Sequence, residues 1–133
     1  MPSIRAPIVK PFFRFKHFIS YYLDIVSSAR YTKGIKYELR STKQYDKWLA
    51  GIKDRQARNR ILRRIDSMVI GSFGDHKTIS ANLFELRMFF SPGFRVYYTI
   101  QGREIIFLLA GGNKSSQKKD IAKARELLQQ LEI

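Results

Sequence analysis

The chain of 133 residues contains no cysteine and only two histidines. The lack of cysteine excludes disulfide bonds, thiolate nucleophiles and cysteine-ligated metal sites. His17 and His76 lie far apart in the sequence, so we expect neither a zinc site nor any other metal site. Any chemistry must therefore use arginine, lysine, tyrosine, carboxylate or a single histidine side chain.

Acidic residues are scarce. The chain has 11 Asp and Glu against 25 Lys and Arg, which gives a formal net charge of +14. Such an excess indicates a polyanionic partner: nucleic acid, an anionic membrane surface or an acidic protein. Charge favours nucleic acid among these, and a basic protein without such a partner is the alternative. The hydrophobic content of 44% is sufficient for the core of one domain.

Long uninterrupted hydrophobic runs are also lacking, even in the aromatic-rich segment 1–35. Three prolines before residue 12 disfavour regular structure there, and residues 13–29 can form a helix. Charged residues interrupt this helix, so we expect neither a transmembrane span nor a signal peptide, and we expect a cytoplasmic protein. We interpret 1–35 as an N-terminal extension of unknown role. A surface-binding amphipathic helix, a helix packed on the domain and an extension without function are the alternatives.

From residue 36 the hydrophobic pattern becomes regular. Alternation of apolar and charged residues predicts a strand over residues 35–40. The remaining periodicities predict two helices, four strands and a final helix, over residues 42–51, 55–70, 77–79, 84–90, 94–100, 103–110 and 115–131. The order β-α-α-β-β-β-β-α predicts an α+β fold in which helices pack on a small sheet. The short links between the last three strands predict antiparallel hairpins.

Polar residues mark the expected helix starts. Ser41 or Thr42 can cap the first helix, and Asp54 can cap the second. Ser115 or Ser116 can cap the last helix.

Cations occupy defined positions on two of the expected strands. Glu85, Arg87 and Phe89 share one face of their strand, and Arg95 and Tyr97 share a face of the next. If the hairpin register pairs these faces, Arg87, Arg95 and Tyr97 form one patch suited to a phosphate backbone. The sequence alone does not specify that register.

Several segments between residues 48 and 117 occur in an order and spacing typical of a known family. They are Trp48-Leu49, Lys53-Asp54-Arg55, Gly74-Asp75 with Lys77, Glu85-Leu86-Arg87, Pro92-Gly93-Phe94-Arg95-Val96-Tyr97, Leu108-Leu109 with Gly111-Gly112, and Lys114-Ser115-Ser116-Gln117. With them, residues 36–131 resemble the RelE/HigB-type toxins of type II toxin–antitoxin modules, and more narrowly the addiction-module killer proteins. The resemblance implies a toxin domain over residues 36–133. Its implied fold is RelE/ParE-like, with an antiparallel-rich sheet, an N-terminal helix pair and a C-terminal helix.

The resemblance also implies an activity and partners. It implies a ribosome-associated mRNA endoribonuclease that uses no metal or other cofactor and inhibits translation, neutralised by a cognate antitoxin with a HigA-like helix-turn-helix domain. The RNA's own 2′-hydroxyl attacks the adjacent phosphate, which requires a base, an acid and cations for the developing charge. A ParE-like poison of DNA gyrase on the same fold and a non-catalytic RNA-binding module are the alternatives.

The resemblance directs attention to Arg95, which follows a turn where the family places a phosphate-contacting arginine. The other candidate catalytic residues are Arg87, Lys114, Lys77, Tyr97 and His76. Candidate RNA-binding residues lie on the second and last helices: Arg58, Arg60, Arg63, Arg64, Gln117 and Lys118. Each candidate also has a structural alternative, namely a surface ion pair, a solvated side chain or, for Tyr97, a core position. RelE has an active tyrosine near Gln117 that this chain lacks, so the sequence identifies no general acid.

Overall fold

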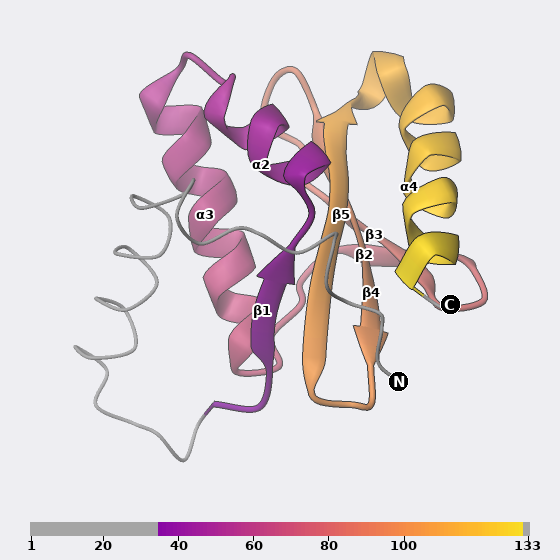
Figure 1. The fold of residues 1–133 in the computed structure, drawn as a ribbon. Coiled ribbons are helices and arrows are strands. Elements are labelled where there is room, and N and C mark those ends of the chain that lie inside the picture. The colour runs from indigo at the N-terminus through magenta and orange to yellow at the C-terminus, as the bar shows by residue number, and fades with distance from the viewer. Residues whose placement is uncertain (1–34, 132–133) are drawn as a thin grey trace.

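A computed structural model describes residues 35–131 as a five-stranded mixed sheet between two helical layers (Figure 1). The elements are β1 (Glu38–Ser41), α2 (Lys43–Ala50), α3 (Arg55–Val69), β2 (His76–Ser80), β3 (Leu83–Arg87), β4 (Phe94–Gln101), β5 (Ile105–Asn113), the short 3-10 helix η3 (Lys114–Ser116) and α4 (Gln117–Leu131). The predicted α+β class and element order are confirmed. The helix expected at 13–29 lies outside the described residues.

The strands are arranged in the order β1-β5-β4-β3-β2. β1 is parallel to β5, while β2, β3, β4 and β5 pair successively as antiparallel neighbours. The helix pair α2–α3 therefore carries the chain from one edge of the sheet to the other. The predicted hairpins at the β3–β4 and β4–β5 links are confirmed.

The caps expected for the first two helices are present. Thr42 accepts a hydrogen bond from the Tyr45 amide at 3.1 Å, and Asp54 caps α3. Before the last helix, Asn113 caps the 3-10 helix η3, and its side chain accepts hydrogen bonds from the Ser115 and Ser116 amides at 2.9 and 3.2 Å. Because β5 continues to Asn113 and this 3-10 turn precedes α4, Ser116 is the residue directly before Gln117, and a serine cap on α4 stays a prediction.

The helices cover opposite faces of the sheet, as Figure 1 shows: α2 and α3 lie on one face and α4 on the other. Apolar residues at helical spacing on α3, such as Ile61 and Ile65, pack with Leu86 and other even-numbered residues of β3 and β4. Alternation along the strands sends Leu83 and other odd-numbered residues to the α4 side. The α4 stripe that meets them comprises Ala124, Leu127, Leu128 and Leu131.

Consecutive glycines at the end of β5 allow both layers to approach this strand closely. A Cβ on Gly111 would collide with the Trp48 ring of α2, and a Cβ on Gly112 would collide with Asp120 of α4. Because neighbouring strand residues point to opposite faces, each glycine admits one helix. Among residues 35–131, the structure contains no helix long and apolar enough to cross a membrane.

Candidate nucleic-acid interface

The register of the β3–β4 hairpin brings the two candidate arginines together. Arg87 lies opposite Arg95, and Glu85 lies opposite Tyr97. Paired residues point to the same face of a sheet, so the condition that the sequence left open is met. This face is the one that α4 partly covers.

An exposed aromatic ring lies close to both arginines. Phe89 is 70% exposed, although it is a large apolar residue in a compact domain. The guanidinium carbons of Arg87 and Arg95 each lie 5.9 Å from the centre of its ring. The arrangement offers a stacking surface with two positive charges close to it. The sequence analysis did not predict a role for Phe89. The pattern that could have indicated one is its position in alternation with Glu85 and Arg87, which places an apolar ring on the face of the charged residues.

A buried carboxylate sits behind this site. The Oε2 atom of Glu85 accepts hydrogen bonds from the Tyr97 hydroxyl at 3.0 Å and from the Gln117 side chain at 2.6 Å. The same oxygen lies 3.7 Å from Nε of Arg95, and the side chains of both residues are almost completely buried. Glu85 therefore connects β3, β4 and the first turn of α4, and it restrains the guanidinium of Arg95. Sequence reasoning did not predict this role.

Tyr97 is a core residue with a polar anchor. Its side chain is buried, and burial together with the neighbouring Glu85 carboxylate raises the pKa of its phenol. The hydroxyl donates to Glu85, so it holds the carboxylate and does not face solvent. Gln117, a candidate RNA ligand, has its amide directed to the same carboxylate.

Arg87 is more accessible than Arg95. Its side chain is 32% exposed, and its Nη2 lies 3.3 Å from Oδ1 of Asp75. This ion pair is the structural alternative considered for Arg87, with a loop carboxylate as the partner. A monodentate, half-exposed pair of this kind contributes little and leaves guanidinium N–H groups available to an anion.

Lys114 lies beside the turn that follows Phe89. It is exposed on η3, and its Cβ is 3.5 Å from the position that a Cβ on Gly93 would occupy. Gly93 has a φ of +85°, a conformation that glycine adopts without strain. Lys114 thus starts from a backbone position next to Gly93 of the β3–β4 turn, which lies two residues before Arg95.

The remaining two catalytic candidates, Lys77 and His76, lie on opposite faces of the sheet. Lys77 pairs with Glu85, so it lies on the Arg87–Arg95 face but on the exposed edge strand β2. His76 pairs with Leu86 and belongs to the opposite face, where its Nδ1 lies 2.8 Å from the Gly74 carbonyl oxygen. The structure does not bring His76 to the arginine pair.

Arg64 of α3 is a structural link. Its guanidinium donates to the carbonyl oxygens of Arg87 at 2.8 Å, Phe73 at 3.0 Å and Asp75 at 3.3 Å. Burial lowers its pKa, and the nearby Asp75 opposes that shift. Arg58 likewise donates to the Ile52 carbonyl.

The other two candidate arginines of α3, Arg60 and Arg63, remain on the surface. The Arg60 guanidinium carbon lies 4.2 Å from the centre of the Phe90 ring, and Arg63 is exposed. Both line a groove of about 280 Å³ between α3 and the end of β3. The groove is lined by Arg60, Arg63, Arg64, Met88, Phe89 and Phe90. Phe89 borders both this groove and the Arg87–Arg95 pair.

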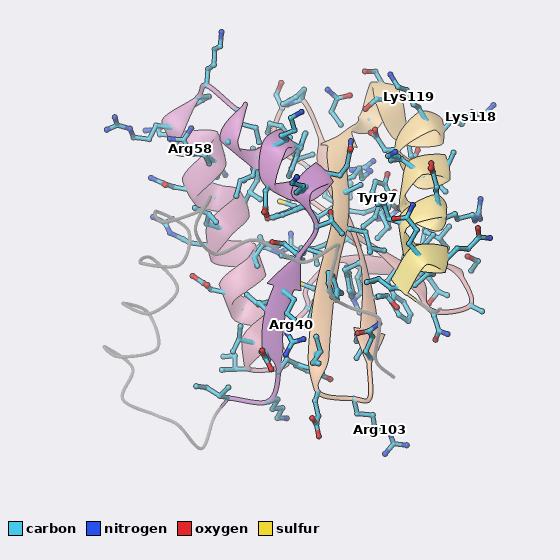
Figure 2. The ribbon with its side chains drawn as sticks, in the orientation of Figure 1. Arg40, Arg58, Tyr97, Arg103, Lys118 and Lys119 are labelled. Atoms are coloured by element: carbon cyan, nitrogen blue, oxygen red, sulfur yellow. The ribbon has the colours of Figure 1, made fainter. Side chains whose placement is uncertain are left out.

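Further cations lie at the start of α4. Figure 2 shows Lys118 and Lys119 at this end of the molecule and Arg103 at the opposite end of the sheet. Lys118, a candidate RNA ligand, is exposed next to Gln117. In the described part of the chain, no group of three or more His, Asp or Glu residues is placed to hold a metal ion.

Comparison with known proteins identifies the family to which the chain belongs. Residues 41–129 match the family described as "Phage derived protein Gp49-like (DUF891)". The chain belongs to this Gp49-like family. The family is associated with toxin–antitoxin modules, including addiction-module killer proteins. The Gp49-like chain is 39% identical over 94 residues to an uncharacterized protein of Haemophilus influenzae, covering 71% of this chain and 95% of that protein. No solved structure matches the chain significantly.

Proposed function

We propose that this Gp49-like protein is a RelE/HigB-type toxin that cleaves mRNA without a metal ion in the cytoplasm and inhibits translation, in association with the ribosome. The observation that carries the proposal is the Arg87–Arg95 pair, with both guanidinium groups close to the exposed Phe89 ring. Single-stranded RNA presents phosphates to cations and unpaired bases to aromatic rings, so this site matches both of its recognition elements.

The chemistry divides between fixed and accessible groups. In the proposed reaction the 2′-oxygen forms a bond to phosphorus, the bond from phosphorus to the 5′-oxygen breaks, and a proton passes from the 2′-hydroxyl to the leaving oxygen. Arg95, restrained by Glu85, and the more accessible Arg87 stabilise the negative charge that develops on the phosphorane. Preorganised guanidinium groups suit this role because they remain charged and donate in a planar array.

Proton transfer must use an accessible group. Tyr97 is buried and donates to Glu85, so in this proposal it positions the site. Lys114 is exposed beside the β3–β4 turn, and Lys77 lies on the same sheet face. We assign these lysines as the candidate proton carriers. His76 has no part, because it belongs to the opposite face.

The decisive test is induced expression in bacteria with mapping of transcript 5′ ends. We expect growth arrest with cut transcripts, and we expect Arg87→Gln to lower the cleavage rate of the purified protein by about 100-fold, the usual effect of removing one charge-stabilising donor. Arg103→Asn is the matched control, because it removes one positive charge from a distant turn where φ is +61°. Asparagine tolerates that backbone conformation.

Other outcomes would point to the alternatives. Growth arrest with intact transcripts and an induced DNA-damage response would replace the ribonuclease with a gyrase poison. Salt-sensitive RNA binding without toxicity would indicate a non-catalytic module. The toxin–antitoxin association of the family supports a cognate antitoxin partner, for which we propose a helix-turn-helix protein that covers the cationic surface.

A further inference from the structure

We propose that the groove between α3 and the end of β3 is a second RNA subsite, which binds an unpaired base and its phosphate next to the Arg87–Arg95 pair. The inference rests on the proposed function, since its occupant is the same RNA strand. It extends that function from the Arg87–Arg95 pair and Phe89 to the adjoining groove, where Arg60 and Arg63 would contact the next phosphate.

Phe89 is the shared wall of the two subsites. Its ring is 70% exposed, it has both guanidinium groups of the arginine pair at 5.9 Å, and it also lines the groove. Every nucleobase can stack on an aromatic face, and a base on Phe89 would leave its two flanking phosphates beside different arginine groups.

The charge of the groove selects a polyanion. Its charged lining consists of Arg60, Arg63 and Arg64, and no acidic residue is among the six residues that form it. Arg60 is held against Phe90 at 4.2 Å, and Arg64 is held by three carbonyl oxygens. These two cations are therefore ordered before a ligand arrives, which lowers the entropic cost of binding. The outer face of the Arg60 guanidinium is itself a plane on which a base can stack.

A direct hydrogen bond couples the groove to the arginine pair. Arg64 Nη1 donates to the backbone carbonyl of Arg87 at 2.8 Å, so α3 is fixed relative to the strand end that carries Arg87. The two subsites consequently keep a constant separation, as successive nucleotides of one strand require. A duplex hides the faces of its bases in the stack, so we infer that the ligand is single-stranded.

Binding of a non-cleavable RNA tests the subsite. The probe is a fluorescent single-stranded hexamer with 2′-O-methyl groups at every residue, titrated with the full chain and followed by anisotropy. We expect Phe89→Ala to weaken binding by roughly 5- to 150-fold, the range for loss of one base–aromatic stack, and Phe89→Trp to retain it. We expect the double variant Arg60→Gln/Arg63→Gln to reduce the slope of log affinity against log salt by about 1.4, for two lost phosphate contacts.

Two further ligands separate stacking from charge. On an abasic oligomer of equal length, Phe89→Ala should have no effect, while the double variant should still reduce the slope. On a duplex of the same sequence, Phe89→Ala should also have no effect. Arg103→Asn and thermal melting of each variant serve as controls for net charge and folding.

The outcomes distinguish this inference from the proposed function. If Phe89→Ala and the double variant bind the hexamer like the wild-type chain, the subsite is refuted, even if the protein cleaves RNA. An acidic protein segment would then be the better occupant of the groove. If these variants lose binding while the wild-type chain never cleaves RNA, the subsite stands and the ribonuclease proposal fails.

Discussion

The two faces of the sheet are built from the same strands but bury different chemistry. On the α2–α3 face, β3 and β4 contribute Leu86, Val96 and Tyr98 to an apolar core. On the α4 face, the same strands bury Glu85 and Arg95 beside apolar neighbours. Both faces therefore bury an apolar core, but the Glu85–Arg95 ion pair lies on the α4 face, behind the Arg87–Arg95 site, whereas the adjoining groove lies on the α3 side.

The α4 face is itself divided along the helix. The later turns of α4 carry a leucine stripe, whereas its first turn carries Gln117 and Asp120. Gln117 donates to Glu85, and Asp120 accepts a hydrogen bond of 2.5 Å from Ser116. A buried carboxylate is stable only with such partners, so the polar start of α4 is what permits Glu85 at this position.

The largest expected contrast comes from the paired glycines of β5. We expect Gly111→Ala to lower the free energy of unfolding by about 3 kcal/mol, because the new methyl group meets the rigid, packed ring of Trp48. Gly112→Ala should cost only about 1 kcal/mol, because the Asp120 side chain can rotate away and lose mainly its hydrogen bond to Ser116. Urea unfolding measures both.

Gly51→Ala provides the control for these substitutions. Its φ is −82° and the nearest atom to the new methyl group would be at 3.4 Å, so we expect a change within about 0.5 kcal/mol. Equal losses at Gly111 and Gly112 would show that the α2 and α4 contacts are equally rigid.

A second contrast removes one hydroxyl from each face. Tyr97→Phe should lower the free energy of unfolding by about 2 kcal/mol, because a buried carboxylate loses a hydrogen-bond donor. Tyr45→Phe should be close to neutral, because the buried Tyr45 hydroxyl has no hydrogen-bond partner among the described residues. Chemical denaturation measures the free energy of unfolding of both variants. A larger loss of this free energy for Tyr45→Phe than for Tyr97→Phe would contradict the assignment of the polar network to the α4 face.

The smallest expected effect is an alkaline loss of stability. Burial is the main cause that raises the pKa of Tyr45 above its ordinary value of 10.0, so the folded protein keeps this phenol neutral while the unfolded chain ionises it. Its contribution is complete below pH 10 and falls as pH rises further. We expect Tyr45→Phe to remove on the order of 1 kcal/mol of the decline between pH 9 and pH 10.5.

Stability measured against pH for both proteins tests this effect, since lysine titration is common to the two. Parallel curves above pH 10 would show that the Tyr45 hydroxyl ionises equally in the folded and unfolded states.

Local patterns in the sequence carry the element order of the domain. The predicted helices at 42–51 and 55–70 are close to α2 and α3, because polar caps such as Thr42 and Asp54 and the apolar spacing act within a few residues. Alternation also placed Glu85, Arg87 and Phe89 on one face. The end of the last strand was missed because the glycine pair at its end interrupts the apolar pattern.

The site depends on contacts between residues far apart in the chain. The pairing of Arg87 with Arg95, the carboxylate that restrains Arg95 and the opposite facing of His76 follow from strand register, which local sequence does not encode. Arg64 likewise has a structural role that its exposed neighbours on α3 lack, because carbonyl oxygens of β3 and of the loop before β2 accept hydrogen bonds from it. Sequence therefore established the basic charge, the element order and the face of each strand residue. Packing of α3 and α4 on the sheet established which cations are buried as structure and which, with Phe89, remain at the surface.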